Sequence, residues 1–389
     1  MRSKILSLDR NILALGANSF FTDFSTEMIL PLLPLFMDRF LHASMSEIGF
    51  IEGLAEFGVA MLIALSGFYS DRIGKRKNIT VFGYGLSNLI KPLAFFASST
   101  TMIAMVRVGD RIGKGIRAAP RDALISQSTP KNISGFVFGL HKMLDSAGAV
   151  AGSLFAFAAL WYLGSSETTF RIIFLFSVVP GLVSMAILIF LVLDKPFTPL
   201  KEKHFRPAQL PFEFYLIVLF QGLFSLVAMN YSFMILKAQD NAMPLVIISL
   251  AYTLYNLSIS FFAIPIGNFA DKAGKPALLS FVYLAFGLSA MFINTKLEYA
   301  SWIAFAIYGF FGAGFNSLAK AIISDMIPVN LKATAYGVYY SFIGICTFLS
   351  LYFAGVIWDK FGSQSLFDIA SVGSASLALL LFLNRKRWQ

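Results

Sequence analysis

Charged side chains inside long apolar stretches are the residues of this chain best suited to chemistry. Between residues 107 and 121 they recur at helical spacings, as Arg107, Asp110, Arg111, Lys114, Arg117 and Arg121. At about 100° per residue, these positions fall within an arc of roughly 120° on one face of a helix. A charge in hydrocarbon costs about 2.5 to 3.5 kcal/mol even on the lenient insertion scale. This face therefore predicts oppositely charged partners around a cavity.

Carboxylates in neighbouring apolar stretches supply those partners. They occur as pairs one helical turn apart, and a further stretch adds a lysine three residues before an aspartate. We expect one charge network formed by Asp23, Glu27, Glu52, Glu56, Arg107, Asp110, Arg111, Lys114, Lys142 and Asp145. Burial and nearby cations act oppositely on a carboxylate, so a proton and a solute can compete for one group. The proton-titrating candidates are Asp23, Glu27, Glu56, Asp110 and Asp145. The alternative is a static ionic lattice that only holds helices together.

The elements that must position these charges are membrane-spanning helices. Hydrophobic residues make up 57% of the 389 residues and charged residues only 13%, whereas soluble domains carry about 25% charged residues. A span needs roughly 20 apolar residues. Twelve such stretches are expected, at 11–40, 45–69, 78–98, 101–125, 134–162, 168–193, 211–237, 243–269, 276–295, 299–324, 332–357 and 365–383. The fold class is therefore an all-α membrane protein.

The twelve spans divide into two sets of six. The polar segment 194–210 separates them, so we expect an N-terminal six-helix bundle at 1–193, a cytoplasmic linker at 194–210 and a C-terminal six-helix bundle at 211–389. Counted loop by loop, Lys and Arg number 18 on the side of the N-terminus and 4 on the other side. Basic loops stay in the cytoplasm. This count predicts a multi-pass protein of the cytoplasmic (inner) membrane with both termini inside.

An internal repeat relates the two halves. The string from Gly67 to Arg76, GFYSDRIGKR, recurs 200 residues later as GNFADKAGKP, so that aspartate and both glycines are kept. The repeat indicates two equivalent, parallel halves and hence pseudo-symmetry. Glycines permit close helix approach and a tight turn, and the basic residues anchor the loop at the cytoplasmic face.

This string, its weaker copy and the twelve spans with a central linker resemble the major facilitator superfamily. The resemblance implies two six-helix bundles that rock around a central cavity and expose one solute site alternately to each side. It also implies a cytoplasmic gate formed by the repeated loop residues, which are Gly67, Asp71, Arg72, Gly74, Lys75, Arg76, Asp271 and Gly274. The alternative is that the basic residues only mark the inner side. The string from Asp23 to Pro34 and the charged fourth span are similar to a bacterial efflux-type subset.

The second half carries aromatic and amide side chains in place of midspan charge. Tyr and Asn offer ring faces and hydrogen bonds that suit an amphipathic organic solute. The expected solute contacts are Asn230, Tyr231, Tyr252, Tyr255, Asn256, Asn316, Tyr339 and Tyr340. Interhelical packing and interfacial anchoring are the alternative use of the same residues.

Composition also excludes several functions. Three His and one Cys do not make a soft-ligand metal cluster, and no hydrolytic or nucleotide-binding motif occurs. We therefore expect no enzyme, no metal, no cofactor and no nucleic-acid partner. The partners expected are a small solute, protons and the lipid bilayer, with the protein a monomer. The favoured function is proton-coupled secondary transport of a small organic solute, as an antiporter in the direction of efflux. The alternatives are an importer of a metal chelate, siderophore or nutrient, and a non-transporting membrane sensor or scaffold.

Overall fold

The computed structural model describes residues 9–73, 75–129, 134–194, 210–295, 297, 299–327 and 332–388. Within these ranges the regular structure is helical and no strand occurs. The chain divides into two compact units. The first comprises Met1–Phe36 and Gly58–Lys203, and the second comprises Met37–Phe57 and His204–Gln389. Most of the expected linker, 194–210, lies outside the described residues.

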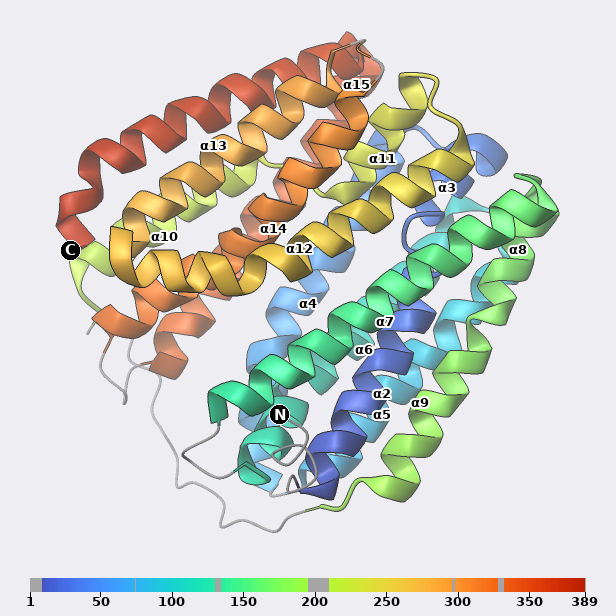
Figure 1. Ribbon diagram of the computed structural model, residues 1–389, viewed down its shortest axis with the longest axis horizontal. Helices are drawn as coiled ribbons and strands as arrows, with labels where there is room; N and C mark the ends of the chain where they lie inside the picture. Colours follow the sequence, from blue (N-terminus) through green and yellow to red (C-terminus); the bar gives the residue numbers. More distant parts are fainter. Residues whose placement is uncertain are drawn as a thin grey trace. The chain divides into compact units, whose positions relative to one another are not determined.

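The first unit is built from helices that run alongside one another, with α2 packed between α7 and α9 and α5 packed on α6 (Figure 1). Its elements are α2 (Arg10–Glu27), the later part of α4 (Met45–Ile73), α5 (Arg76–Ile90), η1 (Lys91–Phe96), α6 (Thr100–Gln127), α7 (Ser134–Leu163), α8 (Glu167–Phe176) and α9 (Val178–Leu191).

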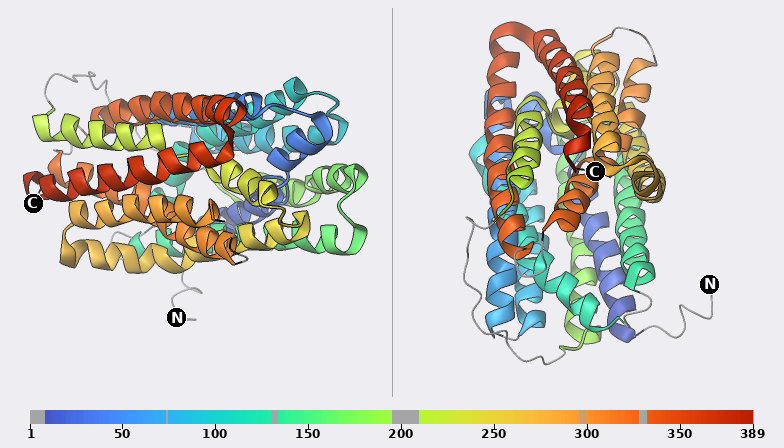
Figure 2. Two further views of the ribbon diagram at one scale, coloured as in Figure 1. Left: turned by 90° about the horizontal axis from the view of Figure 1, so that it is seen from above. Right: turned by 90° about the vertical axis from the view of Figure 1, so that its left-hand side faces the viewer.

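The second unit repeats this pattern with α12 and α13 packed on α14, and with α10 and α13 packed on α15. Its elements are the early part of α4, α10 (Phe212–Val227), α11 (Tyr231–Asp240), α12 (Leu245–Ala273), α13 (Lys275–Ile293), α14 (Ala300–Met326) and α15 (Lys332–Asn384), followed by η4 (Arg385–Trp388). The short helix α3 (Leu33–Leu41) crosses the boundary between the units. The chain reverses direction within α15 (Figure 2). Gly362 makes this reversal because its φ of 83° is non-helical.

The expectation that each span is one continuous helix is wrong for four spans. The first is interrupted between α2 and α3, the third ends as η1, the sixth divides into α8 and α9, and the seventh divides into α10 and α11. Pro31, Pro92 and Pro180 lie at or beside the first three interruptions, where proline removes a backbone donor. At the fourth, Asn230 caps the helix that follows, since its side chain accepts the amide hydrogen of Ser232 at 3.1 Å.

Nine segments of the described residues are long and apolar enough to cross a membrane. This number is consistent with twelve spans. The 53-residue stretch of α15 counts once but folds back on itself, the first span is interrupted, and α6 carries too many charges to be counted as apolar.

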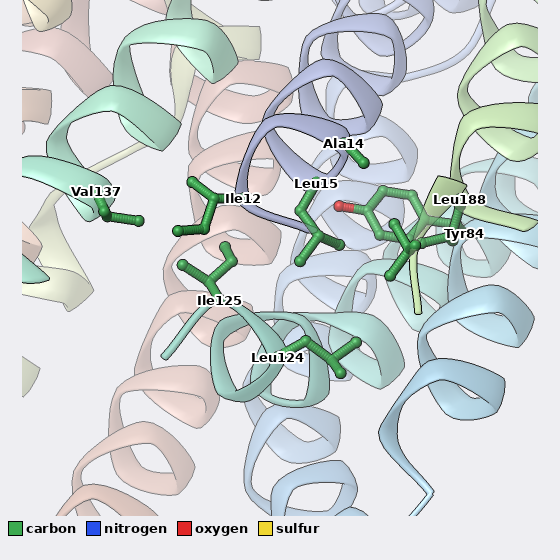
Figure 3. Close-up of a cluster of buried hydrophobic side chains, with 9 residues drawn as sticks. Ile12, Ala14, Leu15, Tyr84, Leu124, Ile125, Val137 and Leu188 are labelled. Atoms are coloured by element: carbon green, nitrogen blue, oxygen red, sulfur yellow. The ribbon is translucent and has the colours of Figure 1, made fainter. Parts of the chain in front are cut away.

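An apolar core holds α2, α5 and α9 of the first unit together. Ile12 and Leu15 of α2, Tyr84 of α5 and Leu188 of α9 are all buried in it. Figure 3 shows the Tyr84 ring lying between Leu15 and Leu188. Close packing of three helices in this region fixes the rotation of α5, and therefore the direction in which its polar residues face.

Candidate functional site

Asp145 of α7 is the centre of a polar cluster in the first unit. The Ser19 hydroxyl of α2 donates to its Oδ1 at 2.7 Å, and the Lys142 ammonium group contacts its Oδ2 at 2.8 Å. Asp23 of α2 is an electrostatic neighbour of Asp145 and of Lys142. The structure thus brings Lys142 and Asp145, three residues apart in the sequence, into direct contact and places Asp23 near them.

Glycines bring α2 and α7 close enough for these contacts. A Cβ atom added at Gly148 would lie 2.2 Å from the carbonyl oxygen of Phe20, and one at Gly152 would lie 2.5 Å from that of Phe24. Neither position therefore accommodates a side chain. The two glycines thus form a small-residue packing face between α7 and α2.

The charged face of α6 turns inward. Arg107, Asp110, Arg111 and Arg117 are buried, whereas Lys114 is exposed and Arg121 is partly exposed. Asp110 accepts a short hydrogen bond from Ser87 of α5. The Arg117 guanidinium group lies 4.3 Å from the Tyr84 ring centroid, a cation–π contact. Gly83 and Gly113 allow this approach, because a Cβ on Gly113 would lie 2.6 Å from the Gly83 carbonyl oxygen.

Lys91 also belongs to this buried cluster. Sequence reasoning missed it because its spacing does not distinguish it from other midspan cations. It begins η1, is 3% exposed and donates to the Thr26 hydroxyl at 2.8 Å. Its ammonium group interacts electrostatically with the carboxyl groups of Asp110, Asp23 and Glu27. A pocket with about 220 Å³ of space not filled by protein atoms is lined by Thr26, Ile29, Leu30, Leu33, Lys91, Val106, Arg107 and Asp110. Charged groups of two helices, η1 and α6, therefore face one small pocket.

The gate residues are described in part. Gly67 lies in α4, and a Cβ there would lie 3.2 Å from the Cβ of Ala119 in α6. Lys75 is exposed and Arg76 begins α5. In the repeat of this motif in the second unit, Gly274 has a φ of 88°, and Lys275 forms a short ion pair with Asp325 of α14. Gly74 and the side chains of Asp71, Arg72 and Asp271 lie outside the described part of the chain.

The aromatic and amide residues of the second unit form two groups. The first contains Asn230 and the rings of Tyr231, Tyr252 and Tyr255. Asn256 is buried one residue further along α12. Tyr339 belongs to the second group, in which its hydroxyl lies 3.4 Å from the amide nitrogen of Gln221. Tyr340 contacts the Tyr339 ring, with centroids 5.4 Å apart, and its own ring centroid lies 5.3 Å from the ammonium group of Lys320. The side chain of Asn316 lies outside the described residues.

Glu52 lies with the first of these groups. The amide of Asn230 donates to its Oε2 at 3.0 Å, and both residues belong to the second unit. Glu56 is one turn further along α4 and acts electrostatically on Tyr308. The Asn230 hydrogen bond thus places the Glu52 carboxylate beside a predicted solute-binding residue, and Glu56 is an electrostatic neighbour of Tyr308. Tyr308 and Gln221 are additional buried polar residues of this unit that sequence reasoning missed, because a single aromatic or amide residue in an apolar span has no distinctive spacing.

Two packed units of apolar helices, each with buried polar groups, define the class of polytopic membrane transport proteins. The chain belongs to the Major Facilitator Superfamily, whose family model matches residues 15–239 and 214–388. An uncharacterised MFS-type transporter of Methanocaldococcus jannaschii is 35% identical over 383 residues, which cover 96% of this chain and 94% of that protein. This membership confirms a transporter rather than an enzyme.

More distant similarities extend the comparison. A Na⁺, Li⁺, K⁺/H⁺ antiporter of Planococcus maritimus is 28% identical over 122 residues, covering 30% of this chain and 28% of that protein. Among solved structures, a D-xylose–proton symporter matches with a TM-score of 0.77 at 13% identity, covering 98% of this chain and 99% of that one. The nucleoside transporter NupG matches with a TM-score of 0.76 at 13% identity, covering 97% and 99%. These two structures share the fold.

Proposed function

We propose that the protein is a proton-coupled secondary transporter that exports a small organic solute by alternating access. The observation that carries the proposal is the set of contacts that Ser19 of α2 and Lys142 make with Asp145 of α7, with the Asp23 carboxyl group as an electrostatic neighbour of Asp145. Two neighbouring carboxyl groups disfavour double ionisation, so one proton can be held between them. Lys142 beside Asp145 offers a countercharge when that proton leaves.

A shared proton at this place suits coupling because its site depends on helix packing. Asp23 lies on α2 and Asp145 on α7, and glycines hold these helices in contact. A small movement of one helix against the other separates the two carboxyl groups and releases the proton. Solute movement and proton movement are then linked through one packed pair of helices.

The test uses the protein reconstituted into vesicles that contain a pH-sensitive dye. A chemically diverse solute panel is screened for proton flux that depends on solute. Asp23→Asn and Asp145→Asn are expected to abolish this flux but to retain counterflow of labelled solute, because binding and the conformational change persist. Glu167→Gln is the matched control, since Glu167 pairs with Arg171 near the start of α8. Unchanged coupling in both aspartate variants would reject the proposal.

Direction and topology require a separate measurement. Export from a cell with both termini inside corresponds to uptake into inside-out vesicles with an acidic lumen. We expect solute accumulation under that gradient and loss of accumulated solute when the gradient is collapsed. Accumulation that requires the opposite gradient would favour the importer.

A further inference from the structure

The break in the seventh span is held in place by specific side chains. Between α10 and α11, the carbonyl oxygen of Ala228 accepts from the Ser350 hydroxyl at 2.7 Å, and that of Met229 accepts from the Tyr308 hydroxyl at 3.1 Å. Non-helical backbone at membrane depth is tolerated where protein or a water-filled cavity surrounds it. Discontinuous helices of this kind also form solute sites in transporters. The break is therefore a built element that positions the residue after it, Asn230.

Asn230 connects the break to a buried carboxylate. Its Oδ1 caps α11, while its Nδ2 donates to Glu52, which is 1% exposed. The amide thereby orients one oxygen of the Glu52 carboxylate. Glu56 lies one turn away on the same helix and acts on Tyr308, the residue that holds the break. Two acidic groups thus adjoin one interruption of the backbone.

Aromatic rings line the same place. The ring centroids of Tyr231 and Tyr252 lie 5.5 Å apart, those of Tyr252 and Tyr255 5.3 Å apart, and those of Tyr255 and Tyr308 5.1 Å apart. The row therefore connects the first residue of α11 with the residue that holds the break. Ring faces attract cations through the aromatic quadrupole, most strongly when both are removed from water. Carboxylates next to such a row favour a positively charged ligand and disfavour an anion.

We infer that this cluster of Glu52, Glu56, Asn230, Tyr231, Tyr252, Tyr255 and Tyr308 is the binding site for an organic ammonium ion. The inference rests on the proposed function and names its substrate class. Glu52 and Glu56 neutralise the ammonium charge, and the tyrosine rings contact its alkyl substituents. Asn230 orients the Glu52 carboxylate, which makes it a positioning residue.

The test measures binding to the full-length protein in lipid nanodiscs, without any proton gradient. The probe is radiolabelled benzyltrimethylammonium, which carries a fixed positive charge and an aromatic ring. Phenylacetate and benzyl alcohol are anionic and neutral compounds with the same ring. Empty nanodiscs of the same lipid correct for partitioning. We expect the cation to bind saturably. Neither control compound should displace it.

Variants then locate the site. Glu52→Gln keeps the shape of the side chain and is expected to weaken cation binding at least tenfold. Glu47→Gln on the same helix is the matched control, because Glu47 contacts Ser44 at an exposed helix start and should leave affinity unchanged. Tyr255→Phe keeps the ring and should retain binding, whereas Tyr255→Leu should lose it. Size-exclusion profiles confirm that each variant is folded.

Any of three results would overturn the inference. The cation does not bind saturably, the neutral compound binds equally well, or the Glu52→Gln and Tyr255→Leu variants both keep wild-type affinity. These outcomes are separable from failure of the proposed function. Cation binding without any solute-dependent proton flux would leave the site standing and reject coupling. Proton-coupled flux of only neutral or anionic solutes would support coupling and reject the site.

Discussion

Gly148 of α7 lies against the backbone of Phe20 in α2 so closely that a Cβ atom at Gly148 would stand 2.2 Å from the Phe20 carbonyl oxygen. Backbone atoms have little freedom to retreat from such a contact. Any side chain at this position must therefore push the two helices apart. The Ser19 and Asp145 contact, one turn away, depends on the same approach.

Substituting this glycine gives the first prediction. Gly148→Val should lower the melting temperature of the detergent-solubilised protein sharply and abolish coupled flux, since overpacking of this kind costs about 1 to 3 kcal/mol or more. Gly85→Ala in α5 is the control, because its added Cβ would make an ordinary 3.5 Å contact with Met185. A Gly148→Val variant as stable as the control variant would show that the helices separate easily.

Removing the buried lysine gives the second prediction. Lys91→Met should destabilise the protein, because it removes the buried donor to the Thr26 hydroxyl and one of the positive charges around Asp110, a loss of about 1 to 3 kcal/mol. Lys91 and Asp110 line the same pocket, so the double variant Lys91→Met/Asp110→Asn should recover part of the loss. Thermal unfolding measures both. Lys77→Met serves as the control, since Lys77 is partly exposed and donates to a backbone carbonyl. A double variant no more stable than the single one contradicts a direct coupling between the two charges.

The buried amide and phenol of the second unit give the third prediction. The Tyr283 hydroxyl donates to the Gln221 side-chain oxygen, and both residues are fully buried. Tyr283→Phe leaves that oxygen short of a donor, with an expected loss of about 1 to 3 kcal/mol. Tyr162→Phe, at a position 83% exposed, should have no effect on the melting temperature. Equal melting temperatures of the two variants would mean that another donor replaces the phenol.

Asp359 gives the fourth prediction, at the start of α4. Its two carboxylate oxygens accept the amide hydrogens of Met45 and Ser46, at 3.0 and 2.9 Å. Asp359→Ala should cost about 0.5 to 2 kcal/mol, as loss of a helix cap does. Hydrogen exchange of the amides at 45 and 46 should become faster, while Lys360→Ala leaves it unchanged. Unaltered exchange in Asp359→Ala would assign the start of α4 to its own capping pair, Ser44 and Glu47.

Apolar length and charge spacing were enough to predict the helices and the pairing of Lys142 with Asp145. Both depend on local periodicity, which a single sequence displays directly. The position of Glu52 was not predictable in this way. Its distance from Asn230 is set by how α4 packs on helices almost 180 residues later in the chain, and sequence spacing carries no such information.

The helix interruptions illustrate the same limit. Proline marks the breaks in the first, third and sixth spans, so a stricter interpretation of Pro31, Pro92 and Pro180 would have found them. The break before Asn230 contains neither proline nor glycine. It exists because Ser350 and Tyr308 satisfy the carbonyl groups that it frees, and those partners come from distant helices.

Helix α4 belongs to both compact units, since residues up to Phe57 group with the second and residues from Gly58 onward with the first. It is nevertheless one uninterrupted helix from Met45 to Ile73. Any hinge motion that separates the units must bend or twist this helix, or separate part of it from the helices against which it packs. A proline introduced near the midpoint of α4 would weaken this connection and decouple the two units. A stiffer α4 would instead transmit motion along its length.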